Sequence, residues 1–339
     1  MEVTPKQCKE LLITALKADL VPMIKGSPGL GKSDIVRSIA KDFNLELVDV
    51  RLSQLDAVDM SGLPSLEGDK ATFKPMNLFP LEGDRIPEGK NGFLLFLDEL
   101  NSAPLSIQAA SFKLILDRYV GSHKLHSKCK IVAAGNKSTD KGIVNRISTP
   151  MQSRMIHLNL EPDHNQWIEW AENNSIDYRI TAFIGYRPEL LFKFDPNHAD
   201  DTFPCPRTWA FLSKITKSHE KLSNGLLPLL AGTVGEGTAI EFFSFCELFE
   251  KLPKYSQIVN NPTGTKIPTD EDPSQLYAVT SMISEHVDAD TFGKAIKYIK
   301  RLPNEFQVLC MVGITRRQPN LKNTPEGNQW LRETALKVM

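Results

Sequence analysis

The chain has 339 residues, of which 41% are hydrophobic and 24% are charged. This is the composition of a globular protein, and it excludes a disordered or fibrous one. At about 150 residues per domain, the length predicts two domains. The 40 basic and 41 acidic residues leave a net charge of -1, which provides no overall field for binding nucleic acid or an anionic membrane.

The length of the apolar runs and the spacing of the cysteines indicate in which cellular compartment the protein is expected. No apolar run is long enough to span a membrane, and residues 1–20 read as a charged amphipathic helix rather than a signal peptide. The five cysteines are widely spaced and include no CxxC pair. We therefore predict a cytoplasmic protein with reduced thiols, no zinc site and no contact with membranes.

The first 160 residues alternate between short apolar strands and helical patterns. The strand at 93–97 is apolar on both faces, which is typical of a central parallel strand covered by helices on each side. The alternation predicts a doubly wound α/β sheet. Residues 53–91 break it with glycines and prolines and are expected to be largely loop. Strands are expected at 21–25, 45–52, 93–97, 130–135 and 155–160, and helices at 34–43 and 106–118.

The chain is mostly helical from residue 161 onward. Helical patterns occur around 167–176 and at 208–218, 274–287 and 291–300. Residues 260–273 are polar and rich in proline, and they predict a linker. We expect an α/β domain over 1–160, a helical domain over 161–259 and a C-terminal helical extension over 260–339.

Residues 26–33, GSPGLGKS, match the phosphate-binding pattern GxxxxGK[ST]. The glycines allow backbone N–H groups to turn toward phosphate oxygens, and the following helix offers its positive N-terminus. Because the segment follows an apolar strand and opens a helical pattern, a phosphate loop is favoured over an ordinary glycine turn. Lys32 is expected to reach the β- and γ-phosphates, and Ser33 to ligate Mg²⁺. The expected nucleotide-binding residues are Gly26, Ser27, Pro28, Gly29, Leu30, Gly31, Lys32 and Ser33.

Two acids and an amide follow later strands. Asp98 and Glu99 end the apolar strand FLLFL, and Asn136 ends the strand KIVAAG. Carboxyl ends of strands are where open α/β sheets bind ligands. Asp98 is expected to hold Mg²⁺ and so to help bind the nucleotide, whereas Glu99 would polarise the attacking water. Asn136 would contact either the γ-phosphate or that water.

Three arginines are candidate functional residues because they accompany these motifs. Arg154 precedes the strand MIHLNL, and Arg207 enters a helix of the second domain just after a Pro-Cys-Pro turn. We expect both to be functional, although a lone arginine is more often a surface side chain. Arg146, eight residues before Arg154, is an alternative candidate.

The order of these motifs resembles that of AAA+ ATPases, over residues 20 to 215. The closer resemblance is to the MoxR branch. It lies in LDELN at 97–101 with AP at 103–104, QAA at 108–110 and LDR at 116–118, and in AGN at 134–136 followed by Pro150 and Ser153-Arg154. Met155 departs from the phenylalanine that is usual in that branch.

This resemblance implies a P-loop AAA+ core, a helical lid over 161–259 and a ring of subunits, expected to be a hexamer, that binds ATP at each interface. Arg154 would enter the neighbour's site as an arginine finger, and Arg207 would report the nucleotide state from the lid. Residues 53–91 would carry a pore-facing hairpin, with Phe73, Met76 and Phe79 either facing substrate or packing on their own domain.

The resemblance further implies an ATP-hydrolysing remodelling motor or chaperone that acts on protein, with a von Willebrand A domain protein as a possible partner. The alternative is a nucleic-acid-directed loader or restriction-type motor, which the charge balance and the lack of a DNA-binding motif disfavour. A nucleotide-gated scaffold with little turnover is a third possibility, and the intact Asp98-Glu99 pair argues against it.

Overall fold

The computed structural model describes residues 1–67, 69–140, 145, 147–197, 200–269 and 273–338. The chain forms two compact units. The first comprises Met1–Asp163 with Asp195–His198, and the second His164–Phe194 with Ala199–Met339. Within the described ranges, no helix combines the length and the apolar character needed to cross a bilayer.

The first unit contains a six-stranded parallel sheet in the order β1-β10-β2-β9-β6-β3. Because β9 and β6 lie between β2 and β3, the chain crosses over the sheet in both directions. This confirms the doubly wound α/β core expected from the sequence. The strands are β1 (Glu2–Val3), β2 (Val21–Lys25), β3 (Glu46–Arg51), β6 (Phe93–Asp98), β9 (Cys129–Gly135) and β10 (Met155–Leu160).

Strand β1 was not expected from the sequence. Only two residues long, it pairs with the end of β10, Glu2 opposite Asn159 and Val3 opposite Leu160. So short a segment carries no alternating pattern that could distinguish it from a loop.

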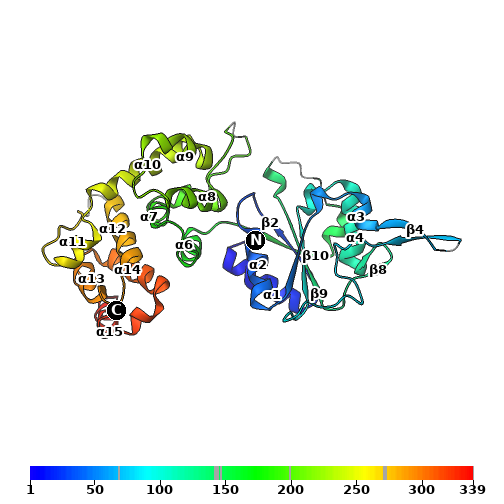
Figure 1. Ribbon diagram of the computed structural model, residues 1–339, viewed down its shortest axis with the longest axis horizontal. Coiled ribbons are helices and arrows are strands. Elements are labelled where there is room, and N and C mark those ends of the chain that lie inside the picture. The colour runs from blue at the N-terminus through cyan, green and yellow to red at the C-terminus, as the bar shows by residue number, and fades with distance from the viewer. Residues whose placement is uncertain (68, 141–144, 146, 198–199, 270–272, 339) are drawn as a thin grey trace. The chain divides into compact units, whose positions relative to one another are not determined.

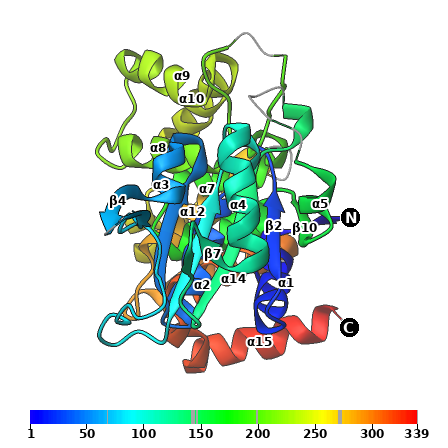
Figure 2. The same ribbon diagram turned by 90° about the vertical axis from the view of Figure 1, so that its right-hand side faces the viewer.

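Helices cover both faces of this sheet (Figures 1 and 2). On β6, Leu95 and Leu97 join the core that includes Ile107 of α4, while Leu94 and Phe96 are fully buried on the opposite face. Burial on both faces explains the uninterrupted apolar run. On one face lie α1 (Pro5–Lys17) and α2 (Lys32–Asp42), and on the other lie α3 (Ala57–Ser61) and α4 (Leu105–Asp117).

Residues 53–91 are more ordered than the expected loop. They contain α3 and an antiparallel hairpin of β4 (Leu63–Glu67) and β5 (Lys70–Lys74), which projects from the rest of the unit (Figure 1). A second hairpin, β7 (Tyr119–Val120) and β8 (His123–Lys124), adjoins it, since the His123 ring lies 2.8 Å from the carbonyl oxygen of Phe73. Phe73 is exposed and Met76 is half-buried, whereas Phe79 is buried in the core.

The second unit is entirely helical over its described residues. One hydrophobic core joins its early and late helices and includes Trp167, Phe183, Ile283, Tyr298 and Trp330. The helices are α6 (His164–Asn173), α7 (Tyr178–Tyr186), α8 (Pro206–Thr216), α9 (Leu227–Val234), α10 (Glu236–Lys251), α11 (Tyr255–Asn260), α12 (Pro273–His286), α13 (Phe292–Ile299), α14 (Asn304–Arg317) and α15 (Pro325–Val338).

The described part of the expected linker packs against this core. The Tyr298 hydroxyl donates to the carbonyl oxygen of Lys266 at 2.9 Å, and Arg301 donates to those of Pro262 and Thr265. Proline and polar residues here mark a bonded loop between helices, which composition alone does not distinguish from a flexible linker.

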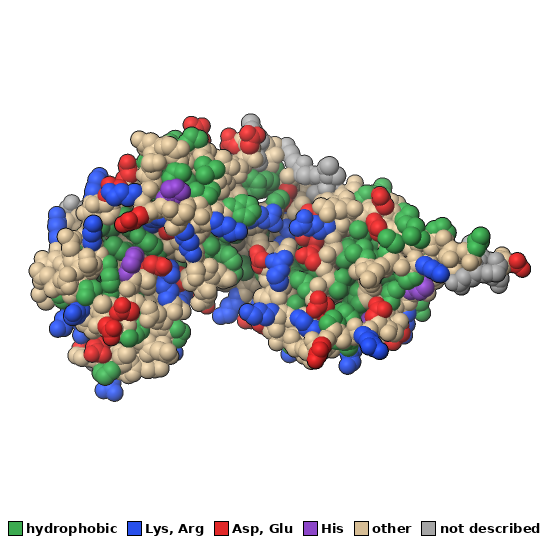
Figure 3. Space-filling view, in the orientation of Figure 1, with side chains coloured by type: hydrophobic (Ala, Val, Ile, Leu, Met, Phe, Trp, Pro, Cys, Tyr) green, Lys and Arg blue, Asp and Glu red, His purple; other side chains and the backbone are tan. Residues whose placement is uncertain are grey.

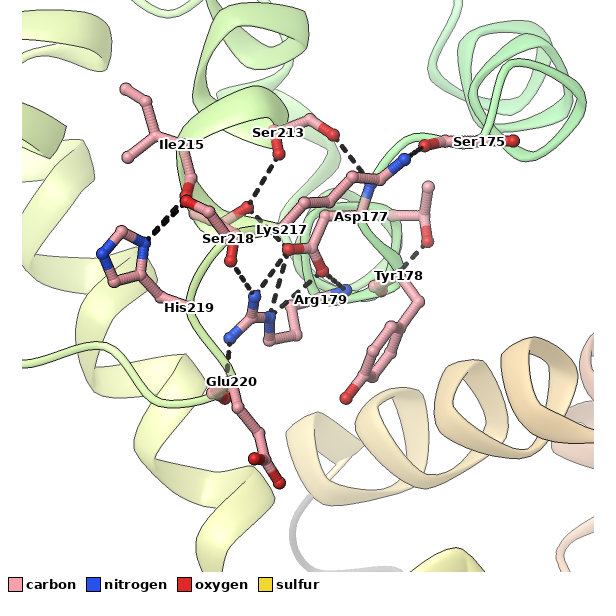
Figure 4. A network of polar contacts seen from close by, with 12 residues as sticks. Ser175, Asp177, Tyr178, Arg179, Ser213, Ile215, Lys217, Ser218, His219 and Glu220 are labelled. Atoms are coloured by element: carbon pink, nitrogen blue, oxygen red, sulfur yellow. Dashed lines mark hydrogen bonds and ion pairs between the residues drawn. The ribbon is translucent and has the colours of Figure 1, made fainter.

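A buried ion pair at the start of α7 is hydrogen-bonded to the end of α8 (Figure 4). The guanidinium of Arg179 donates to both carboxylate oxygens of Asp177, and it also donates to the carbonyl oxygens of Thr216 and Glu220. The Thr216 hydroxyl donates to the same carboxylate at 2.6 Å. Because nearly every polar atom of this pair has a partner, the fold tolerates two charges that are less than a tenth exposed.

Candidate functional site

The candidate site begins at the loop between β2 and α2. Gly29 and Gly31 both have a φ near +80°, a conformation that favours glycine. Gly31 is also the N-cap residue of α2 and supplies no side-chain cap. The first backbone N–H groups of α2 therefore have no side chain competing for them, as a phosphate-binding helix N-terminus requires.

The side chain of Lys32, the first residue of α2, folds back onto this loop. Its ammonium donates to the carbonyl oxygens of Gly26 at 2.6 Å and Ser27 at 3.1 Å, and to Oδ1 of Asn136 at 3.2 Å. The loop thus curls around its own cation. The loop is also tied to the neighbouring strand, because the Gly26 amide donates to the carbonyl oxygen of Gly135.

Ser33 and Asp98 form a pair of oxygen donors. The Ser33 hydroxyl lies 3.4 Å from Oδ2 of Asp98, the last residue of β6. Burial raises the pKa of the Asp98 carboxyl above its ordinary value, and the nearby Lys32 ammonium offsets part of that shift. A hydroxyl and one carboxylate fit Mg²⁺, which prefers oxygen ligands and keeps waters and phosphate oxygens in its remaining positions.

Glu99 follows Asp98 in an unusual backbone conformation. Its φ of 57° is left-handed, which is rare for a residue other than glycine and is typical of functional sites. The carboxylate of Glu99 accepts a hydrogen bond from the Ser53 hydroxyl. Its amide donates to Oδ1 of Asp98 at 2.8 Å, so the two acids share one rigid turn.

Asn136 follows β9 and faces the loop through the hydrogen bond from Lys32. Its backbone is held by the side chain of Asn101. Four residues later, the buried carboxylate of Asp140 accepts from the Ser27 hydroxyl at 3.0 Å. The segment after β9 is therefore bonded to the phosphate loop at two points.

The fold brings together five of the residues expected from the sequence. They come from the carboxyl ends of three strands that are neighbours in the sheet, β2, β9 and β6. A basic side chain, a pair of magnesium-type oxygen donors, a second carboxylate and an amide can together bind a nucleotide phosphate and activate a water. These residues are Lys32, Ser33, Asp98, Glu99 and Asn136.

Arg154 lies at the amino-terminal end of the parallel strands, opposite the end that carries the phosphate loop. It precedes Met155, which is paired with Val21 at the start of β2, whereas the phosphate loop follows the end of β2. Five residues of strand span about 16 Å. The Arg154 side chain is exposed, donates to the carbonyl oxygen of Pro150 at 2.7 Å and lies 5.2 Å from the Phe112 ring centroid.

The other two arginines are placed differently. Arg207 is exposed in the first turn of α8, in the second unit. Arg146 lies outside the described residues.

Three further residues around the site were not expected from the sequence to contribute to it. Ser53, Asn101 and Asp140 each hold one of the expected residues by a hydrogen bond. Asn101 lies within the LDELN segment, so its place in that motif was a signal. Ser53 and Asp140 lie in turns that follow strands, and the residues they contact are set by the order of the strands in the sheet. No local sequence pattern therefore identifies these two residues.

One segment of the chain is similar to a known protein family. Residues 22–155 match the family model of the AAA domain, dynein-related subfamily. No curated protein sequence matched the chain.

Several solved structures show similarity at low identity. A candidate ATPase from Cytophaga hutchinsonii is 14% identical with a TM-score of 0.37, over 98% of this chain and 89% of that one. NtrX from Brucella abortus is 13% identical with a TM-score of 0.39, over 92% of this chain and 63% of that one. The RuvB Holliday junction branch migration motor of Thermotoga maritima is 17% identical with a TM-score of 0.37, over 88% and 86%.

Proposed function

We propose that the chain is an ATPase of MoxR type that hydrolyses ATP at the subunit interfaces of a ring and remodels protein partners. The observation that carries this proposal is the convergence of three strand ends on one phosphate loop. Lys32 donates to Asn136 after β9, and Ser33 lies 3.4 Å from Asp98 at the end of β6.

Each group has a role in this proposal. The loop amides and Lys32 bind the phosphates of ATP, and Ser33 and Asp98 hold Mg²⁺. When bound, Mg²⁺ would neutralise charge that develops on the phosphate oxygens. Glu99 orients and polarises the attacking water, and Asn136 contacts the γ-phosphate or that water.

Arg154 acts on a neighbouring subunit in this proposal. An arginine at the far edge of the sheet, about 16 Å along β2 from its own loop, is too distant to serve that loop. Its side chain is exposed, so the guanidinium can approach a second copy, where it would stabilise the charge of the transferring phosphoryl group.

The remaining assignments rest on the resemblance to the MoxR branch. Residues 161–259 act as a lid whose Arg207 reports the nucleotide state, residues 260–339 extend it, and the ring is a hexamer. The β4–β5 hairpin contacts the client protein, and a von Willebrand A domain protein is the partner. Leu63, Leu66 and Phe73 of that hairpin are exposed, and their hydrophobic side chains support its role in binding protein. Figure 3 shows hydrophobic side chains at the surface in this part of the unit.

Two substitutions test the activity. We expect Lys32→Ala to abolish nucleotide binding because it removes the cation inside the loop, and Glu99→Gln to keep ATP bound without hydrolysing it. Calorimetry and phosphate release measure the two properties, with Lys41→Ala on the exposed end of α2 as the control. Hydrolysis by Glu99→Gln at the wild-type rate would exclude Glu99 as the residue that activates water.

A further inference from the structure

The side chain of Asn101 holds both backbone polar groups of Asn136. Its Nδ2 donates to the Asn136 carbonyl oxygen at 2.7 Å, and its Oδ1 accepts from the Asn136 amide at 3.0 Å. Asn101 is only 4% exposed. Two good hydrogen bonds from one rigid carboxamide fix the position and the direction of the Asn136 backbone.

The two hydrogen bonds from Asn101 to Asn136, which we call the clamp, leave no room for a side chain at residue 135. A Cβ atom on Gly135 would lie 2.2 Å from Oδ1 of Asn101 and 2.7 Å from Cε of Met23. Residue 135 must therefore be glycine for Asn101 to reach the next peptide group. Gly135 is the last residue of β9, and its φ is not positive. The clamp, and not a backbone conformation reserved for glycine, therefore requires glycine at this position.

The clamp links the two halves of the proposed active site. Asn101 belongs to the same turn as Glu99, whose carbonyl oxygen accepts from the amides of Ser102 and Ala103. Asn136 in turn accepts a hydrogen bond from Lys32. A single buried side chain thus connects the carboxylate assigned to the water with the amide assigned to the γ-phosphate.

We propose that Asn101 is a positioning residue that sets Asn136 relative to Glu99, so that recognition of the γ-phosphate and the rate of hydrolysis depend on it while binding of ADP does not. The inference rests on the proposed function. Its physical basis is that misplacing a reacting group by about 1 Å can cost up to 10²-fold in rate. Loss of either hydrogen bond would also leave a buried peptide group unpaired.

Asn101→Ala removes both hydrogen bonds, and Asn145→Ala is the matched control. The Asn145 side chain donates to the carbonyl oxygen of Ala103 at 2.9 Å, so its loss removes a hydrogen bond from the same turn without touching Asn136. We expect Asn101→Ala to lower kcat by about tenfold or more. The control should stay within about twofold of the wild-type kcat, because Asn136 keeps both of its hydrogen bonds.

Affinities give a readout that does not depend on turnover. In the Glu99→Gln background, titration with ATP and with ADP should show weaker ATP binding for Asn101→Ala and unchanged ADP binding. If both affinities fall together, or if Asn145→Ala shows the same losses, the role of Asn101 is structural and the inference is overturned. Wild-type values for Asn101→Ala would overturn it as well.

A second variant covers failure to fold. Asn101→Asp keeps the size of the side chain and one acceptor for the Asn136 amide, but it places a carboxylate oxygen against the Asn136 carbonyl. We expect the same split between ATP and ADP. If neither variant folds, Asn101 supports only the fold. Absence of nucleotide binding by the wild-type chain would overturn the proposed function itself, and this inference with it.

Discussion

The Ser53 hydroxyl donates a hydrogen bond to the carboxylate of Glu99, 46 positions further along the chain. The two residues meet because β3 and β6 are parallel neighbours whose last residues, Arg51 and Asp98, are paired. Both therefore follow strands that end at the same edge of the sheet. The carboxylate that we assign to the attacking water is thus held by a group in the turn that follows another strand.

We predict that Ser53→Ala raises the basal ATPase rate by about threefold, because a carboxylate that gives up a hydrogen bond becomes a better general base. Steady-state phosphate release measures the effect. Ser38→Ala in α2, whose hydroxyl donates to the carbonyl oxygen of Ile35, is the control. A slower Ser53→Ala enzyme would mean that Ser53 aims the carboxylate rather than restraining it.

A second prediction concerns Asp98. Burial raises its pKa in the folded chain above the unfolded value, so the folded state binds more protons between the two values. In the absence of Mg²⁺, stability therefore falls as the pH rises from the unfolded pKa through the folded pKa. We expect Asp98→Asn to be more stable than the wild type at neutral pH, and to lose hydrolysis that depends on Mg²⁺.

Thermal unfolding from pH 4 to pH 8 without magnesium tests the sign of this effect. The advantage of Asp98→Asn should shrink toward low pH, where the wild-type carboxyl is protonated. An advantage that grew as the pH fell would contradict the assignment to Asp98.

A third prediction concerns the buried pair of the second unit. Arg179→Ala leaves the Asp177 carboxylate buried with only its hydroxyl and amide partners, and breaking such a pair costs about 3–5 kcal/mol. Arg187 at the end of α7 is the matched control, since its ion pairs with Glu189 and Glu241 are exposed and worth about 1 kcal/mol or less. Urea unfolding of the two variants measures the difference. Equal losses would show that burial does not set the value of the Asp177–Arg179 pair.

A fourth prediction separates the two arginines. We expect Arg154→Ala to bind ATP normally and to hydrolyse it at least about 10³-fold more slowly, as loss of an arginine finger would require. Arg207→Ala should weaken nucleotide affinity as well, because Arg207 is assigned to the subunit's own lid. Calorimetric titration and phosphate release distinguish these two kinds of defect.

Mixing experiments test whether Arg154 acts in trans. Arg154→Ala and Lys32→Ala subunits each retain what the other lacks, so a mixed ring regains some complete interfaces. Recovery of ATPase activity on mixing is the expected result. If the subunits are shown to assemble together without recovery, Arg154 is not the finger and Arg146 becomes the candidate.

Several elements of the fold and of the site could be predicted from local patterns in the chain. The apolar strand 93–97, the phosphate loop at 26–33 and the acids that follow at 98–99 are each readable within one short segment, because strand burial and phosphate binding impose their pattern on consecutive residues. The doubly wound fold followed from the alternation of these segments, and the structure confirms it.

The contacts that hold those groups in place could not be predicted in this way, because they join segments that are distant in the sequence. Ser53 reaches Glu99, and Asn101 reaches Asn136, because β3, β6 and β9 are side by side in the sheet, and strand order is not encoded in any local period. Packing likewise buried Phe79 while leaving Phe73 exposed, although both are phenylalanines of the segment 53–91, which the sequence pattern predicts to be loop. Hydrophobicity tells that a side chain favours burial, but the surfaces that bury it come from distant parts of the chain.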